Sequence, residues 1–257
     1  MQEIIQRMHQ DLQALGVEKG DALFVHSSLK SLGPIEGGAK TVIEGLKSYL
    51  GDEGTLLFPG FSWDSVTREN PVFDYYNTVT CVGYLPEFFR TQVKGVVRSI
   101  HGTHSCCALG KRAEELVNGH EKDVTPVGKN SPLYKLWGIG GKILFIGCSS
   151  NHNTTMHGVE ELFGASYCIN KENPVNYVLG DRNGKKTTLK SYRHLFHWNG
   201  EHVGQCYARL ENLLNAKEMK KGKLLQADCT LMLSSAVWEK GLEKLKQDEW
   251  YFVDAKR

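Results

Sequence analysis

The sequence predicts an α/β fold, with helices packed against a sheet of short buried strands. Three apolar runs each contain a segment of the length of one buried strand, and they lie at residues 22–25, 54–62 and 142–146. Pro59 and Gly60 end the strand in the second run. The first and third runs each lead through a turn of small or polar residues into an amphipathic helix, an order of elements that is typical of α/β proteins.

The other elements follow from periodicity and from residues that begin or end helices. Gly16 ends an N-terminal helix with an apolar stripe, and Ser131 followed by Pro132 is typical of a helix start. We expect helices at residues 2–16, from Ala39 to about Leu50, and at 83–92, 108–118, 131–137, 207–216 and 234–247, a hairpin at 175–192, a strand at 224–233 and a solvated loop at 217–223.

Length and composition predict one domain over residues 1–257. The chain has 257 residues, of which 40% are hydrophobic and 23% charged, so it can bury a full core. We find no repeat, low-complexity tract or linker in it. A subdomain that begins at about residue 170 stays open, because the pattern of elements changes there.

Charge and cysteine content exclude several classes of protein. The net charge of +2 and the isoelectric point of about 8.1 are too weakly basic for nucleic-acid binding. No apolar run approaches the roughly 18 residues that span a bilayer. The seven cysteines include no CxxC pair, so we expect reduced thiols and a cytoplasmic protein.

The candidate active site is the stretch from residue 142 to residue 164. Its buried strand, 142–146, ends in a polar loop, and Asn153 and Thr154 offer caps for the next helix. Ligands of α/β proteins bind at the carboxyl ends of strands. Helical spacing places Met156, Val159, Leu162 and Phe163 on the face toward the core and His157, Glu160 and Glu161 on the opposite face.

His157 has the properties of a general base. It lies in the first helical turn, where the helix dipole disfavours positive charge and keeps the imidazole neutral. A carboxylate one turn later can orient the ring or hold a cationic substrate. The alternative is that these polar side chains only form the solvated face of an amphipathic helix.

A second candidate site lies in the turn after the first strand, at residues 26–38. Ser27, Ser28, Gly37 and Gly38 leave the backbone accessible ahead of a helix, so the turn can cradle a phosphate. It matches neither a Walker loop nor GxGxxG, and a plain glycine-rich connection is the alternative. The long aromatic segment 62–82 either walls a pocket or packs over the core.

Histidines and cysteines suggest two further sites, which the sequence supports less well. His101 and His104 are three residues apart, but no further ligand lies near them in the sequence, so we expect no metal there and favour a structural role or contact with a ligand. Cys106, Cys107 and Cys148 leave open a thiol nucleophile, although no GxSxG-type elbow surrounds them.

Four segments together resemble one known family. They are HSSLKSLGPIEGGAKTVIEGLKSYLGDEGTLLFPGFS, RSIHGTHSCCALGKRAEEL, GH followed by GKNSPLYKL, and IGCSSNHNTTMHGVEE. In this order they resemble the aminoglycoside 3-N-acetyltransferase family over most of residues 1–165, and more loosely beyond. The resemblance implies a three-layer αβα sandwich that is unrelated to the GNAT fold. It also implies direct transfer of an acetyl group from acetyl-CoA to a primary amine.

The resemblance also implies roles for individual residues. His157 is the general base and Glu160 its acidic partner. The residues expected to contact coenzyme A are Ser27, Ser28, Gly37, Gly38, Ser105, Thr154 and Thr155. We expect Asn151 and Glu161 to contact the amine substrate, although Asn151 stands where many resistance enzymes carry an Asp.

The charge balance bears on the substrate. Proteins that bind polycationic aminoglycosides tightly usually present an acidic cleft, and a chain at +2 shows no sign of one. A nucleotide-linked amino sugar, which is anionic, suits this balance better, and a coenzyme A-binding protein with weak activity is a third alternative. The expected partners are acetyl-CoA and a small amine, with no metal. Homodimerisation stays open.

Overall fold

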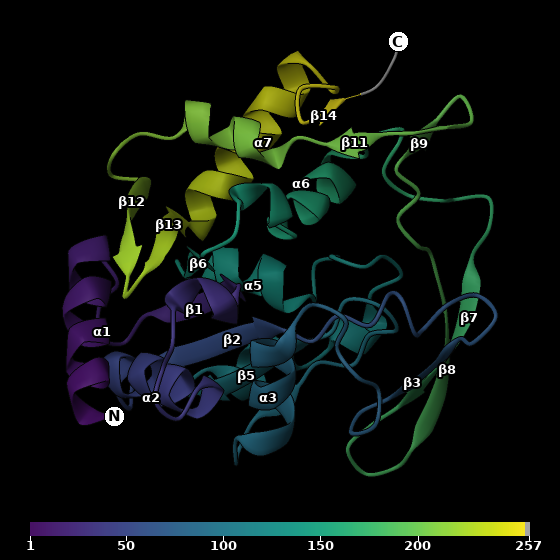
Figure 1. Ribbon diagram of the computed structural model, residues 1–257. Coiled ribbons are helices and arrows are strands. Elements are labelled where there is room, and N and C mark those ends of the chain that lie inside the picture. Colours follow the sequence, from purple (N-terminus) through teal and green to yellow (C-terminus); the bar gives the residue numbers. More distant parts are fainter. Residues whose placement is uncertain (255–257) are drawn as a thin grey trace.

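A mixed seven-stranded sheet forms the centre of the protein, in the order β12-β13-β6-β1-β2-β5-β4 (Figure 1). The computed structural model describes residues 1–254, so residues 255–257 of the expected domain lie outside the described residues. β1 runs parallel to β2 and β6, and the other neighbours are antiparallel. The strands are β1 (Ala22–Ser27), β2 (Thr55–Pro59), β4 (Val97–Arg98), β5 (Cys106–Gly110), β6 (Lys142–Ile146), β12 (Met219–Leu224) and β13 (Ala227–Leu233).

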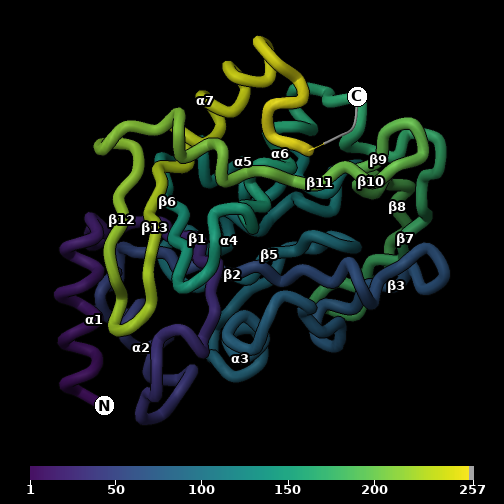
Figure 2. Tube along the Cα trace, turned by 45° about the horizontal axis from the view of Figure 1, so that its top comes forward, coloured from purple at the N-terminus to yellow at the C-terminus, as the bar shows by residue number. Residues whose placement is uncertain are grey.

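Helices cover both faces of this sheet (Figures 1 and 2). Alternation along the strands divides the core, because Leu23 and Val25 pack toward one helical layer and Phe24 toward the other. One layer holds α1 (Gln2–Leu15), α2 (Ala39–Leu50) and α3 (Tyr84–Gln92), and the other holds α4 (Ala113–Val117), α5 (Pro132–Gly138), α6 (Thr155–Phe163) and α7 (Ser234–Gln247). The predicted three-layer α/β fold is therefore confirmed.

Three smaller sheets lie outside the central one. The predicted hairpin is confirmed as β7 (Val175–Gly180) and β8 (Lys186–Ser191), which β3 (Val72–Asp74) joins on the far side of β7. This sheet stands to one side of the central sheet in Figure 1. The other pairs are β9 (His197–Trp198) with β10 (Glu201–His202), and β11 (Gly204–Gln205) with β14 (Val253–Asp254), and the 3₁₀ helices are η1 (Leu29–Leu32), η2 (His120–Lys122), η3 (Ser150–His152) and η4 (Tyr207–Leu213).

Three sequence predictions of secondary structure are wrong. The helix expected at 108–118 begins only at Ala113, because residues 106–110 pair with β2 as strand β5. The lysine-rich segment 217–223 is not a loop, since most of it forms the edge strand β12, where exposed lysines suit a sheet edge. The helix expected at 207–216 is a shorter 3₁₀ helix. No helix within residues 1–254 is both long and apolar enough to cross a membrane.

The carboxyl ends of β1 and β6 lie side by side, because the two strands are parallel neighbours. The N–H of Ser28 donates to the carbonyl of Ile146 at 2.8 Å. Gly147, with φ of 60°, follows β6, and a Cβ at this position would lie 1.6 Å from Oγ of Ser31. The two turns that follow these strands are therefore in direct contact, and only glycine fits between them.

Candidate active site

A cavity of about 710 Å³ opens at the carboxyl ends of β1 and β6. Ser27 lines it from the end of β1, and Asn151 and Thr154 line it from the turn after β6. His157 enters it from the first turn of α6. The two stretches that the sequence singled out as candidate sites therefore share one cavity.

His157 is held by a chain of hydrogen bonds. Its Nδ1 lies 2.8 Å from the hydroxyl oxygen of Tyr207, and the Tyr207 O–H donates to Oε2 of Glu160 at 2.7 Å. When Tyr207 gives its single proton to Oε2 of Glu160, Nδ1 of His157 is the donor in the first bond. Nε2 then keeps its lone pair, which is the state a general base requires.

Burial sets the charge of these groups. It lowers the pKa of His157 well below the usual value, and the neighbouring His194 lowers it further. Burial also raises the pKa of Glu160 to about 8, against hydrogen bonds from Tyr207 and Tyr167 that lower it. The imidazole is therefore neutral at physiological pH, and the cause is burial rather than the helix dipole on which the sequence prediction relied.

The two carboxylates of α6 do not lie on a solvated face, which corrects the predicted orientation of the helix. Glu160 is 0% exposed and the Glu161 side chain 5%, whereas Leu162, expected in the core, is 39% exposed. The cause is a covering layer, since Tyr167, Tyr207 and His194 bond to the two carboxyl groups from later segments. The alternative of a merely solvated helix face is also wrong.

Glu161 lies behind His194 rather than on the cavity wall. Its Oε1 is 2.7 Å from Nε2 of His194, and both its oxygens accept from the N–H of Val127. Burial raises the pKa of Glu161 to about 8 and lowers the pKa of His194 to about 3. His194 lines the cavity, and the sequence analysis gave it no role, because it lies beyond the hairpin in a segment without a motif.

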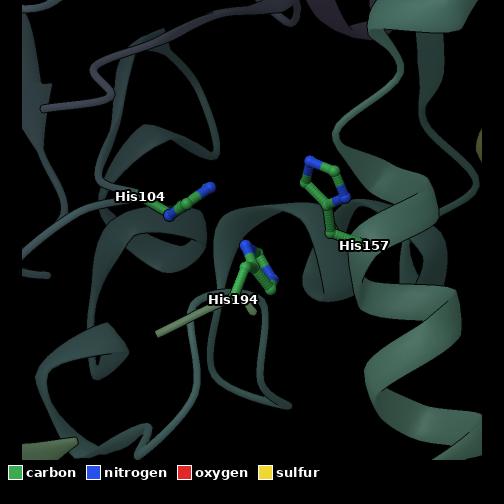
Figure 3. A group of neighbouring side chains, drawn as sticks. All are labelled: His104, His157 and His194. Carbon is green, nitrogen blue, oxygen red and sulfur yellow. The ribbon is translucent and has the colours of Figure 1, made fainter. Parts of the chain in front are cut away.

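Three histidines meet in the cavity, as Figure 3 shows for His104, His157 and His194. Each offers a ring nitrogen, and these nitrogen atoms lie within 4.8 Å of one another. The sequence could not show this group, because His157 and His194 come from segments distant from His104. His101 faces elsewhere, with Nδ1 accepting the N–H groups of residues 103 and 104 and its ring stacked on His120.

Of the residues expected to contact coenzyme A, Ser27 and Thr154 line the cavity and five do not. Ser105 is buried, where it donates to the carbonyl of Gly60 and accepts from Arg98. Thr155 is 0% exposed, at the start of α6. The others belong to the turn region before α2 and are Ser28, Gly37 and Gly38.

Asn151 organises the far wall of the cavity. Its side-chain amide donates to the carbonyl of Gln205 at 3.0 Å and accepts from the N–H of Ala208 at 3.3 Å. Tyr207 lies between these two anchor points. Asn151 therefore helps to place the phenol that holds His157, a role that an amide can fill and a carboxylate cannot, because the bond to Gln205 needs a donor.

Imidazole and aromatic side chains dominate the cavity wall. Among the described residues that line it there is no Asp or Glu, so it is not an acidic cleft. Of the aromatic residues expected at 62–82, Trp63 lines the cavity, whereas Phe73 is buried beneath the guanidinium of Arg98, 4.6 Å from its ring centroid. The basic and imidazole side chains in the wall are Arg193, His26, His104, His152, His157, His194 and His202.

The candidate thiol nucleophiles are poorly suited to attack. Cys148 lines the cavity, but burial raises its pKa to about 11. Burial also raises the pKa of Cys107 to about 11 and that of Cys106 well above the usual value. All three are protonated near neutral pH, and the nucleophilic form of cysteine is the thiolate.

Comparisons with known proteins agree on one family. Residues 24–246 match the family model described as aminoglycoside 3-N-acetyltransferase. The chain is 32% identical over 254 residues to the SPbeta prophage-derived aminoglycoside N(3')-acetyltransferase-like protein YokD of Bacillus subtilis (strain 168). This match covers 90% of this chain and 89% of the relative. It is 39% identical over 166 residues to an aminoglycoside N(3)-acetyltransferase III of Salmonella sp, over 58% of this chain and 57% of that one.

Solved structures show the same fold. The binary complex of AAC-IIIb with CoASH superposes with a TM-score of 0.78 at 26% identity, over 98% of both chains. A mutant of AAC(3)-IVa in complex with a gentamicin superposes with a TM-score of 0.79 at 26% identity, over 96% of this chain and 90% of that one. The fold therefore extends along almost the whole chain.

Proposed function

Because the chain belongs to the aminoglycoside 3-N-acetyltransferase family, we propose that it transfers the acetyl group of acetyl-CoA directly to a primary amine of an aminoglycoside or a related amino sugar, with His157 as general base. Membership of the family makes it an acyltransferase. The observation that supports the finer proposal is the shared cavity, which is lined both by the neutral imidazole of His157 and by Ser27 at the end of β1.

In the proposed reaction the amine nitrogen attacks the thioester carbonyl carbon. The new C–N bond forms as the carbonyl becomes a tetrahedral oxyanion, and Nε2 of His157 accepts the proton that the nitrogen loses. The C–S bond then breaks, and the thiolate of coenzyme A leaves and takes up that proton. Glu160 acts through Tyr207, because the hydrogen-bond chain keeps Nδ1 of His157 protonated and so presents the lone pair on Nε2.

The proposed positions of the substrates follow from the cavity wall. The thioester lies between the Ser27 turn and Thr154, whose hydroxyl can donate to the oxyanion. Arg193 and the neighbouring imidazoles form the part of the wall that the acceptor meets. Asn151 acts on the acceptor only indirectly in this proposal, because its amide already bonds to the 205–208 segment.

Substitution of His157 tests the catalytic step. We expect His157→Ala to lower kcat by on the order of 10²–10⁴, which is the usual contribution of a general base. Binding of acetyl-CoA, measured by calorimetry, should persist. The matched control is His152→Ala, which removes another imidazole of the same wall. Turnover of the His157 variant at the wild-type rate would remove this residue from the mechanism.

A second candidate acceptor is a nucleotide-linked amino sugar. The observation that favours it is the composition of the wall, in which Arg193 and six histidines face the cavity without a carboxylate among the described lining residues. Such a wall gives a polycation no counter-charge, whereas the N–H groups of its imidazoles can donate hydrogen bonds to the oxygens of a diphosphate.

Release of coenzyme A across a panel of amines separates the candidates. A kcat/KM that is higher for nucleotide-linked amino sugars than for aminoglycosides supports the anionic acceptor, and turnover of aminoglycosides alone contradicts it. Thermal stabilisation by acetyl-CoA without turnover on any amine would instead identify a coenzyme A-binding protein with little activity.

A further inference from the structure

His104, His157 and His194 come from three separate parts of the chain and meet at one point (Figure 3). His104 precedes β5, His157 belongs to α6, and His194 follows β8. The ring centroids of His157 and His194 are 4.6 Å apart, those of His104 and His194 4.9 Å, and those of His104 and His157 6.1 Å. Each ring offers one nitrogen to a common space, where these atoms lie within 4.8 Å of one another.

From this geometry we propose that the three imidazoles bind one divalent transition-metal ion of the Zn²⁺ type. Imidazole is a preferred ligand of Zn²⁺, Cu²⁺ and Ni²⁺. Three protein nitrogens leave a fourth position of a tetrahedral site open, and all three histidines line the cavity from which a water molecule or ligand can reach it. Zn–N bonds of about 2.1 Å place tetrahedral donors about 3.4 Å apart, so the rings must close on the ion by small side-chain rotations.

The surroundings of each ring fit a metal ligand. Metal-binding histidines almost always use their second nitrogen for a hydrogen bond that fixes the ring. Here Thr103 Oγ1 lies 2.8 Å from Nδ1 of His104, and the Tyr207 hydroxyl lies 2.8 Å from Nδ1 of His157. A Glu161 oxygen lies 2.7 Å from Nε2 of His194. In each ring the remaining nitrogen is the one available to the ion, and Glu161 supplies the carboxylate that often backs such a ligand.

The ion and acetyl transfer would compete for His157. A metal on Nε2 occupies the lone pair that the proposed general base needs, and it stands where the amine must approach. Zn²⁺ bound at this site therefore inhibits the enzyme. This consequence rests on the proposed function, whereas the binding of the ion does not.

Spectroscopy with Co²⁺ tests the site directly. The full chain is freed of metals with a chelator and then titrated with CoCl₂, and we expect one equivalent to give the visible absorption of tetrahedral Co²⁺. Calorimetry with ZnCl₂ should give the same stoichiometry. We expect His104→Gln and His194→Gln each to weaken binding by at least about 10-fold.

Two control variants distinguish metal binding by the three histidines from binding by other side chains of the cavity wall. His202→Gln removes an imidazole of the same wall that lies outside the group, and Cys148→Ser removes the thiol that lines the cavity. Neither change should weaken binding. The proposal is overturned by an affinity that is insensitive to His104→Gln, or by binding that is lost with Cys148→Ser.

Inhibition is read as the ratio of the acetylation rates with and without ZnCl₂. The ratio should fall well below one for the wild-type chain, return to one when EDTA is added, and stay near one for His104→Gln whatever the absolute rate of that variant. If no amine is acetylated at all, the proposed function fails while the Co²⁺ spectrum still decides the metal site.

Discussion

Tyr207 is the residue on which the geometry of His157 depends. The sequence analysis paired His157 with Glu160 directly, because they are three apart on a helix. Nδ1 of His157 and Oε2 of Glu160 are 4.0 Å apart, and the Tyr207 hydroxyl bonds to both side chains. No sequence signal marks this tyrosine, which lies 50 residues after His157 in a segment without a motif. Spacing on one helix can pair two residues, but it cannot show a third that arrives from elsewhere.

We predict that Tyr207→Phe lowers kcat by on the order of 10- to 100-fold, which is a fraction of the general-base contribution. The variant keeps the ring in place and removes the hydroxyl that accepts from His157. Steady-state kinetics measure the effect. Tyr167→Phe is the matched control, because it removes the other phenol on Glu160 without touching His157, and its kcat should stay close to wild type. Equal losses in the two variants would contradict the relay.

The raised pKa of Glu160 also predicts how the free energy of unfolding depends on pH. Its folded pKa is raised from 4.5 to about 8, so between these values the folded chain holds a proton that the unfolded chain has released. Stability must therefore fall as pH rises through this window, by at most about 1.4 kcal/mol per pH unit for this group.

We predict that Glu160→Gln removes this part of the pH dependence. The free energy of unfolding of the variant, relative to wild type, should rise steadily from pH 5 to pH 8. Urea unfolding of both proteins at several pH values measures it, with Glu243→Gln as a control at a side chain that is 64% exposed. A difference between Glu160→Gln and wild type that does not vary with pH would show that Glu160 is already ionised in the folded state.

At the scale of elements, most helices and the parallel strands could be predicted. α1, α2, α3, α5 and α7, the strands β1, β2 and β6, and the β7–β8 hairpin all match expectation. β5 was mistaken for part of a helix, because its five residues are too few to show a strand period. The orientation of α6 was wrong for another reason. Periodicity identifies the two faces of a helix, but a face that later segments cover is buried without being apolar.

α6 packs closely against α7, and this contact helps to fix the position of α6 and therefore of His157 in the cavity wall. Gly158 is the contact point, since a Cβ there would lie 2.5 Å from the Trp238 ring and 2.6 Å from a methyl group of Val127. Glycine lowers helix stability, so its use beside His157, the proposed general base, reflects the close approach of the two helices.

We predict that Gly158→Ala destabilises the protein by about 1–3 kcal/mol, because overpacking outweighs the better helix propensity of alanine. Thermal unfolding measures the change. Gly138→Ala at the end of α5 is the control, since a Cβ there meets nothing within 4 Å, and this variant should be no less stable than wild type. A Gly158 variant as stable as wild type would show that α6 and α7 can separate without cost.

At the scale of the whole molecule, the C-terminal third is built into the central sheet. β13 pairs with β6, which is the strand that leads into the candidate site. β14 pairs with β11, which ends at Gln205, shortly before Tyr207. Because of these connections, we continue to predict one domain, and the alternative of a subdomain beyond about residue 170 is left to experiment.

We predict a single cooperative unfolding transition for the full chain. Scanning calorimetry should give equal calorimetric and van't Hoff enthalpies, since β13 cannot separate without exposing an edge of β6. Two resolved transitions would instead support a separate C-terminal unit.

The candidate site is also a property of the whole molecule. The sequence analysis singled out Ser27 and His157 from the segments that follow buried strands and Thr154 from the family resemblance, and all three line the cavity. It missed Tyr207 and His194, which the later, irregular segments bring over the cavity. The local sequence pattern predicts which residues lie at the end of a strand. It does not predict which residues cover a cavity, because these come from segments many residues away.

The contact between Gly147 and Ser31 determines the distance between the two turns that border the cavity. Because residue 147 carries no methyl group, the turn that bears Thr154 rests directly on the turn that follows Ser27. The missing Cβ of Gly147 thus determines how far apart the turns stand for a molecule that bridges them, although Gly147 does not itself line the cavity. A substitution at Gly147 would push the two turns apart, and with them the proposed positions of the thioester and the amine, although every side chain that lines the cavity would remain.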